Sequence, residues 1–170
     1  NKKLILFKLS YLIMSYGSLH LNHIQAERIN SIELSGTTLN LNTNNSGSII
    51  FLDPANATGI IDITLPGLPS SSDANQKTNK TYKGINYSFI LKTNGSNNIT
   101  ITSKNLSNDT TALIYGSGVP NKTEVSASST ITLVSSFHEI GDRVSLICDG
   151  YNWFANWVIK TTNSSAITLT

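Results

Sequence analysis

The feature that most constrains this chain is a double alternation of apolar and polar residues between Gly141 and Ile159. Two alternating segments flank the pair Asp149-Gly150. Apolar residues at every second position predict half-buried β-strands, and an Asp-Gly pair tolerates the positive φ that a tight reversal needs. The segment therefore predicts a β-hairpin whose return strand turns two tryptophans, Trp153 and Trp157, towards the core.

Similar short patterns recur along the chain. Apolar runs and alternations of strand length are separated by turns rich in Asn, Gly, Pro and Ser, and no window keeps a helical period. The predicted strands are 48–52, 59–65, 82–93, 98–102, 112–115, 130–134, 144–148, 153–159 and 166–169. The strands 82–93 and 98–102 flank Asn94-Gly95 and predict a second hairpin. Together these segments predict an all-β fold, an antiparallel, jelly-roll-like β-sandwich of about nine or ten strands.

The chain divides into an N-terminal arm, residues 1–45, and a sandwich domain, residues 46–170. Within the arm, residues 36–42 predict a small polar strand that must pack on the main domain or on copies of itself. Residues 1–13 resemble the start of a signal peptide, although Lys8 interrupts their apolar run and no cleavage site follows. Alternatively, they are upstream sequence and the natural chain starts at Met14. The run is too short to span a bilayer.

Charged side chains are scarce. They make up 13% of the 170 residues, with a formal net charge of +2 and no basic run. The polar surface must therefore consist mostly of Asn, Ser and Thr, which suit turns and the outward faces of strands. We expect one domain with a substantial core, no nucleic-acid partner and no stable membrane span.

No group of residues stands out as a catalytic or metal site. His20 and His23 have the spacing His-x-x-His but lack further ligands nearby, and His138 beside Glu139 is typical of a loop pair. The sequence contains no Gly-x-Ser-x-Gly elbow and no phosphate-binding glycine loop. Four aspartates at strand ends or turns are expected to cap backbone donors: Asp53, Asp62, Asp142 and Asp149. We predict no enzymatic activity, no metal and no cofactor.

Aromatic residues near the hairpin turn are the candidate binding residues. Tyr151, Trp153 and Trp157 have flat rings of the kind that stack on sugar faces. The alternation nevertheless favours burial of both tryptophans, which leaves Tyr151 as the more exposed ring. Cys148 is the only cysteine, so no intrachain disulfide forms, and its place in the alternation predicts a small buried apolar residue.

Glycosylation sequons of the form Asn-x-Ser/Thr are frequent. They would carry glycans if the chain passed through a secretory compartment. A chain this rich in Asn, Ser and Thr also produces sequons by chance, and we favour that interpretation. The sequons include Asn56, Asn79, Asn94, Asn105, Asn121 and Asn163.

The order of these segments resembles the β-sandwich domains of bacteriophage tail fibres and of capsid and fibre structural proteins of large (giant) DNA viruses. The likeness covers residues 46–160. Its most specific part is Gly-Asp-x-Val-x-Leu-x-x-Asp-Gly-x-Asn-Trp at residues 141–153, and the wealth of Asn, Ile and Lys is typical of an AT-rich genome. The chain differs from the fibre proteins in lacking a long repetitive shaft before the domain.

This resemblance implies a virion component, often homotrimeric, that builds capsids or touches the host. We therefore expect a non-enzymatic viral structural protein, a minor capsid or capsid-surface component. Its expected partners are itself as a homotrimer, other capsid proteins and host-surface glycans. An alternative of a different class is a monomeric, secreted, lectin-like module that binds glycans through residues 70–81 and Tyr151.

Overall fold

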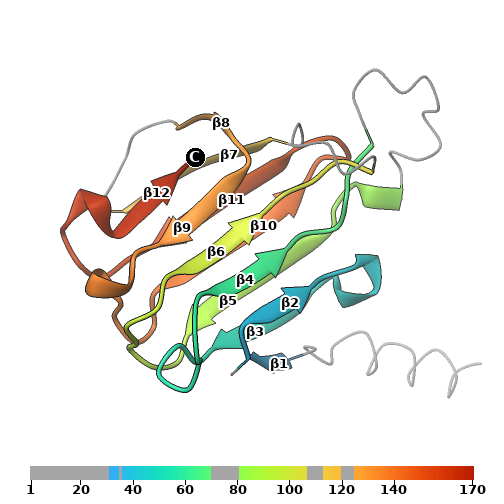
Figure 1. Cartoon of the computed structure of the whole chain (residues 1–170). Coiled ribbons are helices and arrows are strands. Elements are labelled where there is room, and N and C mark those ends of the chain that lie inside the picture. Colours follow the sequence, from blue (N-terminus) through green and yellow to red (C-terminus); the bar gives the residue numbers. More distant parts are fainter. Residues whose placement is uncertain (1–30, 35, 70–80, 107–112, 120–124) are drawn as a thin grey trace, which may run out of the picture.

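The computed structural model describes residues 31–34, 36–69, 81–106, 113–119 and 125–170, which form two β-sheets packed face to face (Figure 1). Sheet A has seven strands in the order β1-β3-β5-β10-β11-β7-β8, and sheet B has five in the order β12-β9-β6-β4-β2. The predicted all-β sandwich is therefore confirmed. The strands are β1 (Ser31–Leu34), β2 (Thr38–Asn40), β3 (Ser48–Leu52), β4 (Ile61–Thr64), β5 (Asn86–Leu91), β6 (Ile99–Thr102), β7 (Ile114–Val119), β8 (Val125–Ser128), β9 (Thr130–Leu133), β10 (Arg143–Cys148), β11 (Trp153–Val158) and β12 (Ile167–Leu169).

The first six strands alternate between the two sheets. As a result, β1, β3 and β5 are parallel neighbours in sheet A, and β2, β4 and β6 are parallel neighbours in sheet B. This half of the chain winds as a two-sheet coil, in which each turn packs on the next as in solenoid repeats. The remaining strands add mainly antiparallel pairs, although β7 is parallel to β11.

The parallel pairs differ from the antiparallel, jelly-roll-like arrangement that the sequence predicted. The second predicted hairpin is also wrong, because β5 lies in sheet A and β6 lies in sheet B. Between them, a Cβ atom on Gly95 would lie 2.5 Å from the backbone of Pro54. This glycine therefore permits a close approach to the turn after β3 as the chain crosses between sheets, and it does not mark a hairpin reversal.

The described part of the predicted arm belongs to the sandwich. Strand β1 forms an edge of sheet A beside β3, and β2 forms an edge of sheet B beside β4. Leu34 and Leu41 are buried in the common core. The sandwich therefore includes residues 31–34 and 36–45, which the sequence had assigned to the arm. Within the described part of the chain, no helix has the length and hydropathy that a membrane crossing requires.

The predicted hairpin of β10 and β11 is confirmed, with pairs from Arg143↔Val158 to Cys148↔Trp153. Trp153 and Trp157 point into the core and are 0% and 1% exposed. Cβ atoms on Gly116 and Gly118 of β7 would lie 2.6 Å and 2.4 Å from the indole of Trp157. Glycines at the inward positions of β7 therefore leave room for this large ring.

Candidate functional site

The outer face of sheet A carries three rows of side chains that run across the strands. These rows follow from the strand registers, because residues opposite one another on one face lie side by side. Glu33 and Arg143 are the only charged residues in the rows, and both lie in the third. The rows are Asn86, Ile147, Phe154 and Tyr115; then Ser31, Ile49, Ser88, Ser145, Asn156 and Ser117; then Glu33, Phe51, Ile90, Arg143, Val158 and Val119.

Large apolar side chains on three adjacent strands of this face are exposed to solvent. We call Ile147, Phe154, Tyr115, Val158 and Val119 the apolar patch. Ile147 is 52% exposed and Phe154 is 44% exposed. The rings of Tyr115 and Phe154 stack, with centroids 5.8 Å apart and planes inclined by 24°. Grouped exposed apolar side chains mark interaction surfaces more often than chance, whereas isolated ones need no explanation.

A shallow groove of about 310 Å³ lies next to this patch, over β5, β10 and β11. Ile147 and Phe154 line its apolar side. Its polar lining includes Asn86, Asn156 and the hydroxyls of Ser88 and Ser145, whose oxygens are 3.4 Å apart. Tyr87 is the one titratable residue of the lining, and its hydroxyl donates a hydrogen bond to the carbonyl oxygen of Asn42, so the groove offers a neutral contact surface.

The predicted binding residues do not line this groove. Trp153 and Trp157 lie in the core, as the alternation favoured, and Tyr151 is half-buried in the turn after β10. Sequence reasoning did not select Phe154 and Tyr115 as binding residues. The available signal was the same alternation, because the position next to an inward tryptophan faces solvent and a phenylalanine there is unusual.

Asp142 and Asp149 cap backbone donors, as predicted. Asp142 is buried, and its carboxylate accepts hydrogen bonds from the backbone N–H groups of Glu139 at 2.9 Å and Lys160 at 2.8 Å. Asp149 accepts from the N–H groups of two residues in the hairpin turn, both at 2.8 Å. Asp62 instead accepts from the hydroxyl of Thr100. These carboxylates hold turns and strands in place.

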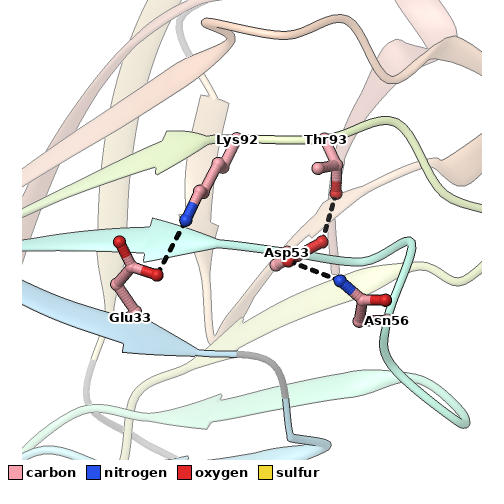
Figure 2. A network of polar contacts seen from close by, with 5 residues as sticks. All are labelled: Glu33, Asp53, Asn56, Lys92 and Thr93. Atoms are coloured by element: carbon pink, nitrogen blue, oxygen red, sulfur yellow. Dashed lines mark hydrogen bonds and ion pairs between the residues drawn. The ribbon is translucent and has the colours of Figure 1, made fainter.

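Asp53 belongs to an exposed polar network at the edge of sheet A (Figure 2). Its carboxylate accepts hydrogen bonds from Thr93 Oγ1 at 2.5 Å and Asn56 Nδ2 at 2.8 Å, which lower the pKa of Asp53. Lys92 Nζ lies 2.7 Å from Glu33 Oε2, and this hydrogen bond raises the pKa of Lys92. The network therefore ties β1 to the end of β5 and fixes the turn after β3. Every member already has a partner, so the arrangement supports a structural role.

The described histidine and the cysteine are both buried. His138 Nε2 lies 3.3 Å from the carbonyl oxygen of Leu133, while Glu139 beside it is exposed. Burial raises the pKa of Cys148 to about 11, so its thiol is protonated at neutral pH, as expected for a small buried residue. Among the residues that the structure describes, no three His, Cys, Asp or Glu side chains are grouped to hold a metal ion. His20 and His23 lie outside these residues.

Acidification is expected to destabilise the fold through His138. Burial lowers the pKa of this imidazole from 6.5, although the Leu133 carbonyl and Asp142 act in the opposite direction. The folded protein then binds fewer protons than the unfolded chain, so stability is fully present above pH 6.5 and is lost as the pH falls below it. Urea denaturation of wild type and His138→Gln on both sides of this pH measures the effect. An equal pH dependence in both proteins would contradict it.

The predicted glycosylation sequons lie in different environments. Asn105 is buried, and the amide nitrogen of Asn56 already donates to Asp53. Asn94 and Asn163 are exposed. Asn79 and Asn121 lie outside the described residues. Of the four sequons named here that lie in the described residues, Asn94 and Asn163 are therefore the two that are exposed and whose amide nitrogen donates no hydrogen bond to the described part of the chain.

The geometry therefore gives one candidate site, the apolar patch with its groove on the outer face of sheet A. Comparison of the chain with protein-family models, curated proteins and solved structures finds no match.

Proposed function

We propose that this protein is a non-enzymatic structural component of a virus particle, at the capsid surface or in a fibre, and that it assembles as a homotrimer through the outer face of sheet A. The observation that carries this proposal is the apolar patch. Its exposed side chains come from three adjacent strands and lie on both sides of a middle row of Ser145, Asn156 and Ser117, so an interface here would combine apolar contacts with hydrogen bonds.

A second copy of the chain is a suitable partner for this face. Glu33 and Arg143 have opposite charges and lie in one row, separated by two strands. Glu33 already pairs with Lys92 of its own chain, so apolar contacts rather than a charge pair would hold the copies together, and a three-fold arrangement can bring the apolar side chains together at its axis. A closed symmetric assembly covers such a patch completely, as a chain with few charged residues needs to remain soluble. Other capsid proteins and host-surface glycans would then meet the faces that the assembly leaves open.

Light scattering on a size-exclusion column tests this proposal. We expect wild type to have three times the chain mass and the double variant Ile147→Asp/Phe154→Asp to be a monomer, because buried unpaired carboxylates oppose association. Both side chains point away from the core, so circular dichroism should show an unchanged fold. Thr168→Asp, an exposed position on sheet B, is the control and should remain trimeric. A monomeric wild type, or a double variant that stays trimeric, would refute assembly through this face.

A secreted, monomeric, lectin-like module is the second candidate function. The stacked rings of Tyr115 and Phe154 lie beside the amide of Asn156, which combines an aromatic platform with a hydrogen-bonding group. Glycan-array binding that is lost in Tyr115→Ala, with the monomer mass unchanged, would support this function. If a monomeric wild type bound no sugar on the glycan array, the lectin-like function would be contradicted.

A further inference from the structure

The outer face of sheet B consists almost entirely of threonine. Two rows run across its five strands, which lie side by side as one layer in Figure 1. Thr170 extends the second row, since it exchanges two backbone hydrogen bonds with Thr130. The rows are Thr38, Asp62, Thr100, Thr132 and Thr168; then Asn40, Thr64, Thr102, Thr130 and Thr170.

These side chains form a two-dimensional array of two rows across five strands. Neighbouring strands are about 4.8 Å apart, and alternate residues along a strand are about 6.7 Å apart. The array is supported from behind, because the intervening residues Ile61, Ile63, Ile99, Ile101 and Ile131 are no more than 1% exposed. Close packing of branched side chains holds each strand in one position. The hydroxyl groups are therefore spaced by the sheet itself.

The preference of threonine for strands does not by itself explain the array. Threonine fits a half-buried pleated surface, and cross-strand threonine pairs stabilise sheets. The same preference applies to the outer face of sheet A, yet none of its three rows contains a threonine. The two outer faces of one chain therefore differ in a way that strand formation does not require.

The chemistry of the array suits an uncharged ligand that both donates and accepts hydrogen bonds. Each threonine offers one hydroxyl of this kind together with a methyl group. Thr100 donates to Asp62, and the hydroxyls of Thr102 and Thr130 are 3.5 Å apart. The hydroxyls of Thr64, Thr132 and Thr168 have no hydrogen-bond partner among the described residues, so they are available to solvent or ligand. Asp62 is the only charged residue in the rows, so charge complementarity favours a neutral partner.

We propose that the outer face of sheet B binds ice. A dissolved polymer repeats in one dimension, whereas this array repeats in two, as a crystal face does. Water molecules in ice are neutral, and each one both donates and accepts hydrogen bonds, as the threonine hydroxyls do. The threonine hydroxyls bind lattice positions, and their methyl groups occupy the spaces between them. This site is independent of assembly through sheet A.

Thermal hysteresis and uptake into a growing ice hemisphere test the proposal on the full chain. We expect wild type to depress the freezing point below the melting point and to enter the ice. Thr132→Tyr places a large ring above the array and should abolish both effects. Thr162→Tyr makes the same change at an exposed loop position outside both sheet faces and should leave them intact, and circular dichroism should show that both variants are folded.

Asp62→Thr provides a gain of function that a purely structural role does not predict. This change completes the first row and removes its charge, so thermal hysteresis should increase. The monomeric variant Ile147→Asp/Phe154→Asp should keep its activity per chain, which separates this proposal from the one about assembly. Exclusion of wild type from ice, unchanged activity in Thr132→Tyr, or binding to crystalline cellulose but not to ice would overturn the proposal.

Discussion

Replacing Trp157 by alanine is expected to lower the free energy of unfolding by about 3–5 kcal/mol, the largest effect of any single substitution considered for this protein. The indole is 1% exposed and fills the space that Gly116 and Gly118 leave open on β7. No small movement of one strand can close this space, since β11 is paired on both sides, with β10 and β7. A domain stabilised by about 5–15 kcal/mol would keep little of its stability after this loss.

Chemical denaturation followed by circular dichroism measures this effect. Phe154→Ala is the matched control, because it removes an aromatic ring from the same strand on the opposite, exposed face. Trp157→Phe should be milder than Trp157→Ala. It keeps most of the apolar volume and removes an indole N–H that has no hydrogen-bond partner among the described residues. Equal destabilisation by Trp157→Ala and Phe154→Ala would contradict the proposed packing.

Gly118→Ala is expected to lower the free energy of unfolding by about 1–3 kcal/mol, although it adds only one methyl group. The new Cβ atom would lie 2.2 Å from the backbone oxygen of Trp157 and 2.4 Å from its indole ring. A flexible side chain can yield to such a contact, but a backbone carbonyl in a strand pair cannot move without separating β7 from β11. We therefore expect the decrease in the free energy of unfolding to lie at the upper end of this range.

Thermal and chemical unfolding of Gly118→Ala would measure this cost. Ser117→Ala is the control, because its side chain projects from the exposed face of the same strand. In a Trp157→Ala background the contact with the indole is gone while that with the carbonyl oxygen remains, so the two substitutions should be less than additive. Full additivity would show that the added methyl group does not meet the indole.

The alternation of apolar and polar residues predicts only part of the candidate site. The alternation in β11 correctly predicted the burial of Trp153 and Trp157, and it also implied that Phe154 faces solvent. Ile147 and Tyr115 lie on either side of Phe154 because of the strand register, which local alternation does not predict. Tyr115 comes from a strand almost forty residues earlier that is parallel to β11, so only the folded sheet joins these side chains into a patch.

Local patterning predicted most of the strands, their inward faces and the closing hairpin, but not β1 or β8, because it depends on the period-two pattern and on turn residues a few positions apart. The buried thiol of Cys148 and the capping by Asp142 and Asp149 follow from the same local rules. Which strands share a sheet depends on contacts between segments that are distant in the sequence. A turn such as Asn94-Gly95 can reverse a strand within one sheet or carry it across to the other, and contacts with distant residues such as Pro54 select between these outcomes. The parallel winding of the first six strands, the apolar patch and the threonine array all depend on that choice, since each is made of residues that meet only across strands.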